Sequence, residues 1–470
     1  MKRILTVAVI AAAALSLTLV ACGGGSDSGG GGGTGGLNAA KSVTGTALSA
    51  NGDPVPGTTV YLPGTTVTAD VSKKFMPTRS FDKVVTAGDG TECEDPPAAD
   101  QALVSCCAGA NGTFTCDTSG VTTNPTQIVF VRGTLRMVQA LNCTADPCAL
   151  GSEVTKFGSG TTTWPRVAVV TGSWDRMEDV LAKLADDNTS DATNGDYGRV
   201  DSTTGWFVYG SESGTNLTII NGTSQATPSE GTTVPYDDWI TYLNGTKSLV
   251  TGGVPVFDVI FLNCGDYGQN TIDYKATLQA YVDAGGRIYV TDRAYDNIEQ
   301  AFPQFMRYDG DPDDATVPGA LAAAKVGTGG LTVNAAISDA SMRTWLSSRP
   351  VNGNAAGTAP GNPTTDCSGV TGYTSVASAL NADGTIPIGD FLGGWALMTS
   401  AHTGQSPTIW ISSGAGNVFD GLDNRPLTAS MNIGTNGRIV YSSYHTADTC
   451  PTLTFWPQER VLQYLMFGAF

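Results

Sequence analysis

Apolar residues beyond position 163 recur in two alternating patterns, one typical of buried strands and the other typical of amphipathic helices. The apolar stretch within 166–171 has strand character, and the apolar residues that follow recur at helical spacing, at Met177, Val180, Leu181 and Leu184. The alternation continues with strands at 206–209, 257–263, 287–291 and 437–444, and with helices at 236–243, 272–284, 294–302 and 457–467. Strands that alternate with helices favour a mostly parallel sheet covered on both faces. We therefore predict a three-layer α/β domain over residues 163–470, with long loop insertions at about 310–385.

Residues 38–162 carry short strands separated by turns. Strands at 43–48 and 58–62 are joined, as in a hairpin, by a turn at 51–57 rich in Asn, Gly and Pro, and further strands are predicted at 127–131 and 135–141. The stretch V-T-G-T-A-L-S-A-N-G-D-P-V-P-G-T-T-V-Y-L at 43–62 resembles the opening of the carboxypeptidase regulatory-like, transthyretin-like β-sandwich. This resemblance implies a structural or carbohydrate-proximal module without catalytic residues, and hence a multidomain chain with an N-terminal antiparallel β-sandwich.

The first 21 residues have the pattern of an export signal. A cationic start at Lys2 and Arg3 precedes an apolar stretch at 4–20, for which an uncleaved transmembrane anchor is the alternative. The stretch ends in Leu-Val-Ala-Cys, which resembles the bacterial lipobox and implies cleavage before Cys22 and lipidation of its thiol. Gly23 after the cysteine implies, by the same resemblance, anchoring in the outer membrane. We therefore expect a lipoprotein of the bacterial cell envelope, with residues 22–37 as the lipidated Cys and a Gly-rich flexible tether.

Cysteine usage agrees with export. Six cysteines fall within the first module, at Cys93, Cys106, Cys107, Cys116, Cys143 and Cys148. An oxidising compartment favours three disulfides among them, with the pairing left open, whereas a thiolate metal site or redox pair is weakened by the absence of a CxxC spacing. Of the three later cysteines we expect Cys367 and Cys450 to form a fourth bridge, which leaves Cys264 free.

Composition narrows the classes of function. The chain has 470 residues, with 25 Lys and Arg against 43 Asp and Glu for a net charge of −18, so a nucleic-acid partner is not expected. Its length excludes a small disulfide knot, and its 14% of charged residues argues against long helical bundles. The two histidines, His402 and His445, exclude a site with three His ligands.

Three motifs in the larger half resemble the class I glutamine amidotransferase-like fold, a flavodoxin-like architecture, and are closest to its trehalose-utilisation-like branch. They are F-D-V-I-F-L-N-C-G at 257–265, Y-V-D-A-G-G-R-I-Y-V-T-D-R at 281–293 and G-R-I-V-Y-S-S-Y-H at 437–445. The fold implies a nucleophile on the turn after strand 287–291 and a catalytic His after the last core strand. His445 matches that His, but Asp292 stands where the nucleophile would be. No G-x-C-x-G motif occurs, so amidotransferase activity is not expected.

The carboxyl ends of parallel strands meet along one sheet edge, which is the usual ligand crevice. Cys264 or Asp292, paired with His445, could act there as a nucleophile. The structural alternatives are a buried small Cys, a turn Asp beside a surface ion pair, and a locally hydrogen-bonded His. The other residues expected along this crevice are Ser173, Trp174, Asp175, Asn263, Asp266 and Arg293.

One acidic segment has partial calcium-loop spacing. Asp309, Asp311 and Asp313 alternate, so that three carboxylates could surround one cation. The loop lacks the Gly and the closing acid of a calcium-binding motif, which favours a solvated acidic loop. Calcium is therefore the single cofactor considered.

We expect, from all of these features, a lipid-anchored binding or accessory protein of the envelope with a carbohydrate or other small-molecule ligand. The alternative is a hydrolase acting on an exported sugar or peptide derivative. The absence of the amidotransferase Cys favours the first expectation.

Overall fold

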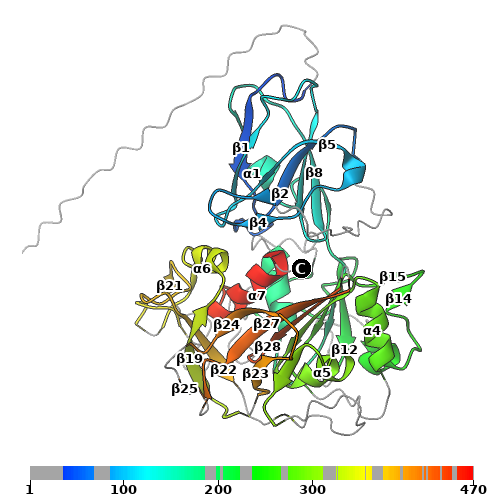
Figure 1. Cartoon of the computed structure of the whole chain (residues 1–470), viewed down its shortest axis with the longest axis vertical. Coiled ribbons are helices and arrows are strands. Elements are labelled where there is room, and N and C mark those ends of the chain that lie inside the picture. The colour runs from blue at the N-terminus through cyan, green and yellow to red at the C-terminus, as the bar shows by residue number, and fades with distance from the viewer. Residues whose placement is uncertain are drawn as a thin grey trace, which may run out of the picture. The chain divides into compact units, whose positions relative to one another are not determined.

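The computed structural model (Figure 1) describes most of the chain, and residues 35–470 form one compact unit by their contacts. The described residues are 35–67, 85–185, 197–201, 205–222, 235–265, 274–310, 324, 327–354, 356–361, 374–391, 395–414, 418–419, 422–434, 437–446 and 453–468. Within them, no helix is long and apolar enough to cross a membrane.

The N-terminal part of this unit is built from short strands. They are β1 (Ser42–Thr46), β2 (Thr59–Pro63), β3 (Val85–Thr86), β4 (Glu92–Cys93), β5 (Ala102–Cys107), β6 (Thr113–Asp117), β7 (Gln127–Arg132), β8 (Leu135–Ala140), β9 (Cys148–Ala149) and β10 (Thr161–Thr163), with a 3-10 turn η1 (Ala98–Asp100) and a short helix α1 (Ser152–Thr155). One sheet has the order β6-β1-β9 and another β10-β8-β7-β2-β5. The rings of Phe114 on β6 and Phe130 on β7 lie 5.8 Å apart, so side chains of the two sheets share a core.

The predicted hairpin over 43–62 is wrong in its pairing. β1 pairs with β6 and β9, whereas β2 pairs with β5 and β7 in the other sheet. The turn itself forms, with the Ser49 N–H donating to the Asp53 carbonyl at 2.7 Å. Every residue of β2 is buried, and a central strand already has a neighbour on each edge, so β2 has no free edge for β1.

Three disulfides join the six cysteines of this part, as predicted. The pairs are Cys93–Cys107, Cys106–Cys116 and Cys143–Cys148. Cys264 is buried and outside any disulfide, in agreement with its expected free state. Cys367 and Cys450 lie outside the described residues, so their expected bridge stays a prediction.

The larger part is organised around a ten-stranded sheet. Its strands are β11 (Val167–Val170), β12 (Leu217–Asn221), β13 (Asp237–Asp238), β16 (Val259–Leu262), β17 (Arg287–Thr291), β19 (Leu331–Ile337), β22 (Ile386–Phe391), β24 (Thr408–Ser412), β27 (Pro426–Ile433) and β28 (Gly437–Ser442). Their order is β13-β12-β11-β16-β17-β28-β27-β24-β19-β22. Pairs from β13 to β28 are parallel and pairs from β28 to β22 are antiparallel.

Helices accompany this sheet, and among the described residues of this larger part four two-stranded sheets lie outside it. The helical elements are α2 (Met177–Ala185), α3 (Trp239–Leu243), α4 (Lys275–Asp283), the 3-10 turn η3 (Asp292–Tyr295), α5 (Asp296–Ala301), α6 (Ala340–Leu346) and α7 (Pro457–Gly468). The small sheets are β14 (Val250–Thr251) with β15 (Val254–Pro255), β18 (Met306–Tyr308) with β23 (Met398–Ala401), β20 (Val351–Asn352) with β21 (Ser375–Val376), and β25 (Val418–Phe419) with β26 (Leu422–Asp423).

Successive residues of the parallel strands face two different cores, because side chains alternate across a strand. Val169 of β11 belongs to a cluster that includes Leu181 of α2 and Leu462 of α7. Its neighbour Val170 belongs to a second cluster that includes Leu278 of α4. Helical side chains therefore pack on both faces, which requires strands that are apolar throughout.

The large sheet has more antiparallel strand pairs than the sequence predicts, and fewer residues of the larger part lie in loops. The insertion expected at about 310–385 contains β19 and α6, and β19 pairs antiparallel with β22 and β24. The strand predicted at 206–209 is reduced to an isolated bridge at Phe207, and β12 takes the sheet position instead. Thr, Asn and Ala make up much of β19, so its hydrophobic periodicity is weak, whereas the apolar 206–209 finds no neighbouring strand among the described residues beyond the single bridge.

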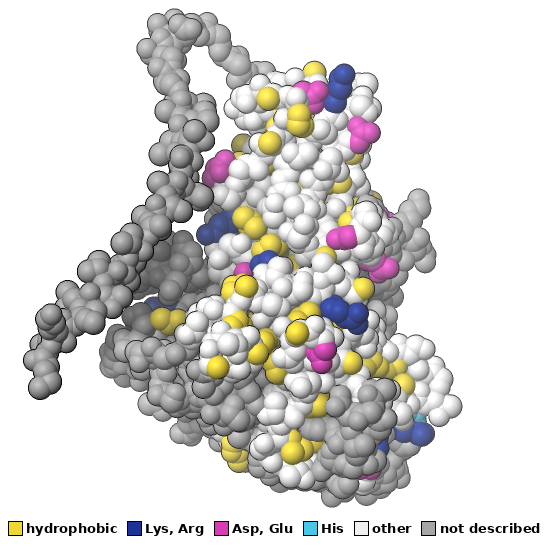
Figure 2. All heavy atoms as spheres, turned by 90° about the vertical axis from the view of Figure 1, so that its left-hand side faces the viewer, with side chains coloured by type: hydrophobic (Ala, Val, Ile, Leu, Met, Phe, Trp, Pro, Cys, Tyr) yellow, Lys and Arg dark blue, Asp and Glu magenta, His cyan; other side chains and the backbone are white. Residues whose placement is uncertain are grey.

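The surface carries few charges. On the face drawn in Figure 2, Lys and Arg side chains and Asp and Glu side chains are scattered singly among uncharged atoms. This matches the 14% of charged residues in the chain.

Candidate functional site

Three chemically reactive side chains follow three neighbouring parallel strands. Cys264 lies two residues after β16, Asp292 directly follows β17, and His445 lies three residues after β28. The register aligns the ends of these strands, since Leu262 pairs with Val290 and Thr291 with Ser442. All three side chains are therefore brought to the same edge of the sheet.

The three side chains meet around the Asp292 carboxylate. Its Oδ2 lies 2.8 Å from His445 Nε2 and accepts a hydrogen bond from Cys264 Sγ at 3.3 Å. Its Oδ1 accepts the Ala396 N–H at 2.8 Å. The exposed fractions are 1% for Cys264, 0% for Asp292 and 1% for His445. The cluster is thus sealed from solvent, although the side chains are within reach of one another.

Asp292 occupies a strained turn between a strand and a helix. Its φ is +43°, a region that residues other than glycine rarely adopt. β17 ends at Thr291, and the chain continues through η3 directly into α5. A sharp strand-to-helix turn of this kind lifts a side chain above the end of a sheet. Here it directs the carboxylate toward Cys264 and His445.

Burial dominates the electrostatics of this cluster. It raises the pKa of the Cys264 thiol to about 12, with a further increase from the Asp292 charge that the His445 ring opposes. Burial by itself lowers the pKa of His445, but the neighbouring Cys264 and Asp292 raise it well above its ordinary value. Burial therefore keeps Cys264 as a thiol at neutral pH, and the neighbouring acidic groups favour the protonated form of His445.

The expected crevice residues divide by exposure. Ser173 and Trp174 are exposed, and 48% of Trp174 is accessible to solvent. Arg293 is half-buried. Asp175 and Asn263 are buried and hydrogen-bonded within the protein. Asp266 lies outside the described residues.

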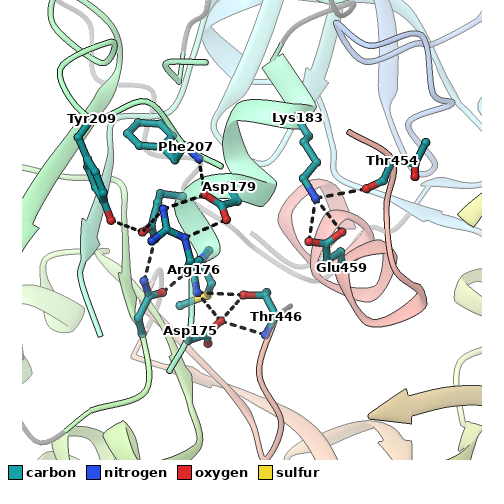
Figure 3. Close-up of polar contacts among 12 residues, drawn as sticks. Asp175, Arg176, Asp179, Lys183, Phe207, Tyr209, Thr446, Thr454 and Glu459 are labelled. Atoms are coloured by element: carbon teal, nitrogen blue, oxygen red, sulfur yellow. Dashed lines mark hydrogen bonds and ion pairs between the residues drawn. The ribbon is translucent and has the colours of Figure 1, made fainter. Parts of the chain in front are cut away.

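Asp175 ties two strand ends together. It accepts hydrogen bonds from the Thr446 N–H at 2.9 Å and from the Thr446 hydroxyl (Figure 3). It also accepts one from the Thr291 hydroxyl. Burial raises the pKa of Asp175 more than the His445 charge and these hydrogen bonds lower it. Asp175 holds the segments that carry Asp292 and His445, and only 2% of it is exposed to solvent.

Sequence reasoning missed a buried polar network along α2. Asn263 Nδ2 donates to Glu178 at 2.8 Å, and Glu178 accepts the Tyr209 hydroxyl at 2.7 Å. Arg176 Nε contacts Asp179 at 3.0 Å, and Asp179 accepts the Phe207 N–H at 2.7 Å (Figure 3). The sequence does carry a signal for this network, because four charged residues fall within 176–183, at and after the start of a helix that is otherwise apolar.

Other predicted sites fall largely outside the described residues. This applies to the lipidation site Cys22 and to Asp311 and Asp313. Asp309 is described and half-buried, directly after β18. Calcium at this segment and lipid at Cys22 therefore stay predictions.

Comparisons with known proteins leave the chain without an assigned family. No protein-family model matches it, and no curated protein matches it significantly.

Proposed function

We propose that this chain is a lipid-anchored binding or accessory protein of the bacterial cell envelope, with a carbohydrate ligand. The observation that carries the proposal is a contrast in exposure at one sheet edge. Cys264, Asp292 and His445 are at most 1% exposed, whereas Trp174 is 48% exposed. A substrate atom cannot reach the three buried groups in this conformation, but a ligand can rest on the indole ring.

Trp174 supplies the chemistry that sugar binding requires. An exposed indole face stacks on the apolar face of a pyranose ring, and its N–H offers a hydrogen-bond donor. Exposed Ser173 is adjacent, and half-buried Arg293 follows a strand of the same sheet edge. These polar groups would orient sugar hydroxyls around the ring.

Binding to purified peptidoglycan sacculi and to lipopolysaccharide tests this proposal. We expect the wild-type chain to bind at least one of them, and Trp174→Ala to weaken that binding at least 10-fold. Leu103→Ala is the matched control, because Leu103 on β5 is the other large hydrophobic residue exposed in the described part of the chain, at 42%. Equal binding by wild type and Trp174→Ala, or no binding to either material, would overturn the proposal.

The domain assignment belongs to the same proposal. We assign residues 38–162 to a carboxypeptidase regulatory-like β-sandwich and residues 163–470 to an amidotransferase-like α/β domain without amidotransferase activity. Asp292 on the turn after β17 supports the loss of that activity, because the family's nucleophile would be a Cys at this position. Glutaminase assays are expected to show no release of ammonia.

Anchoring through Cys22 has its own test. We expect the wild-type chain to sediment with the outer-membrane fraction and to incorporate labelled palmitate. Cys22→Ser should abolish both, because serine lacks the thiol that carries the lipid. A Cys22→Ser protein that still carries label would contradict the assignment.

Hydrolysis is the second candidate function, and the 2.8 Å contact between Asp292 and His445 favours it. The strained turn at Asp292 is also the place where a nucleophile sits in related architectures. If hydrolysis occurs, His445→Ala should lower turnover of nitrophenyl esters or glycosides by about 100-fold or more. Unchanged turnover in that variant excludes this function.

A further inference from the structure

The cluster of Cys264, Asp292 and His445 has the composition of a metal site. It offers one sulfur, one carboxylate oxygen and one imidazole nitrogen, and these atoms all lie within 4.8 Å of one another. Tetrahedral zinc holds such donors roughly 3.3–3.6 Å apart, given metal–ligand bonds of about 2.0–2.3 Å. The observed separation of 3.3 Å from Asp292 Oδ2 to Cys264 Sγ already fits this range, and the 2.8 Å separation from Oδ2 to His445 Nε2 would have to lengthen by about 0.5–0.8 Å.

A divalent cation in this place would be matched in charge by its three ligands. A thiolate at Cys264 and a carboxylate at Asp292 together carry two negative charges, and a neutral His445 adds none. Two buried negative charges are costly in an apolar interior unless a positive partner neutralises them. A divalent ion makes the site neutral, while the thiol proton of Cys264 and the imidazolium proton of His445 are released to solvent.

Hydrogen bonds hold the Asp292 carboxylate and the backbone of Asp292 and His445 in place. The Ala396 N–H occupies Asp292 Oδ1 and leaves Oδ2 directed at the cluster. The Tyr441 hydroxyl donates to the Asp292 carbonyl at 3.2 Å, and Gln458 Nε2 donates to the His445 carbonyl at 3.0 Å. Outer contacts of this kind orient the ligands of metal sites and raise their affinity.

We propose that Cys264, Asp292 and His445 bind one divalent transition-metal ion of the zinc class. A thiolate and an imidazole select zinc or cobalt over magnesium and calcium, which prefer oxygen donors. This site is independent of the carbohydrate surface at Trp174, so either can fail without the other.

Titration of the full chain with Co²⁺ and Zn²⁺ tests the site. After treatment with a chelator, the wild-type chain should bind one Co²⁺ and show a thiolate-to-cobalt charge-transfer band, which Zn²⁺ then displaces. Cys264→Ser should lose the band, and His445→Gln should weaken binding at least 100-fold. His402→Gln is the matched control, because the chain has only these two histidines, and it should bind like wild type.

Several outcomes would overturn the proposal. They are less than one-tenth equivalent of metal bound to wild type, a band that persists in Cys264→Ser, or equal effects of His402→Gln and His445→Gln. Thermal unfolding of the wild-type chain gives a measurement that needs no variant. Zn²⁺ at 100 times its dissociation constant should stabilise the protein by a factor of about 100 in the folding equilibrium, and the absence of any shift would also refute the site.

Discussion

A buried ion pair between Lys183 and Glu459 provides a sharp test of the packing around α2. Lys183 Nζ lies 2.8 and 2.9 Å from the two carboxylate oxygens of Glu459, and the side chains are 2% and 1% exposed (Figure 3). The same ammonium donates to the Thr454 carbonyl at 3.3 Å, and Glu459 also accepts the Trp456 N–H at 2.8 Å. The pair thus joins α2 to the start of α7.

Lys183→Met removes the positive charge and keeps the aliphatic stem. Glu459 is then left as a buried carboxylate whose partner ammonium is missing. Breaking a buried pair in this way costs about 3–5 kcal/mol of unfolding free energy. With an m-value of about 3 kcal/mol/M in urea, the unfolding midpoint should fall by about 1–1.7 M.

Urea unfolding followed by tryptophan fluorescence measures this shift. Lys247→Met is the matched control, because Lys247 pairs with Asp237 at the surface, with the two side chains 44% and 38% exposed. That control should lose no more than about 1 kcal/mol. Adding Glu459→Gln to Lys183→Met should restore much of the loss, since it removes the unpaired charge. Equal midpoints for Lys183→Met and Lys247→Met would refute the reasoning.

Three further predictions concern other parts of the fold. Replacing Cys93 and Cys107 together by Ser opens a loop with a sequence separation of 14 and should cost about 3 kcal/mol in urea unfolding, whereas an unchanged midpoint would contradict it. Asp339→Ala removes the side chain that accepts the Met342 N–H at the start of α6 and should cost about 1 kcal/mol, while Asp339→Asn should cost clearly less. Burial raises the pKa of Asp53, but Arg460, Gln463 and Arg349 together lower it by more than burial raises it. The pKa of Asp53 therefore lies below its ordinary value of 3.8. The stabilisation by ionised Asp53 is therefore complete above about pH 4 and is lost as the pH falls below that value. The difference in unfolding free energy between wild type and Asp53→Asn should accordingly shrink from pH 5 to pH 3. A difference that stays constant over this range would exclude the linkage.

The parallel half of the large sheet could be predicted from the sequence because its hydrophobic pattern is local. Apolar stretches such as 287–291 predict buried strands, and strands alternating with helices imply parallel neighbours. The antiparallel half could not be predicted, since β19, β24 and β27 mix apolar residues with Thr, Ser and Asn. Their identity as strands depends on partners elsewhere in the chain.

The candidate site, too, could be predicted from the sequence only in part. That Cys264, Asp292 and His445 lie at one sheet edge follows from strand direction, which the sequence pattern indicates. That they are sealed from solvent does not follow, because burial depends on every segment packed around them. The Ala396 N–H on Asp292 comes from a residue 104 positions away in the chain.

By itself, the sequence determined the export signal pattern, the disulfide-bonded N-terminal part, the strand-helix alternation and the reactive residues at strand ends. These properties depend on composition and on spacing within short windows. Only the tertiary structure decided that β1 and β2 enter different sheets, that half of the large sheet is antiparallel, and that Lys183 pairs with Glu459. The physical reason is that these features arise from contacts between distant segments, whose free energy depends on mutual burial and leaves no periodic trace in either segment.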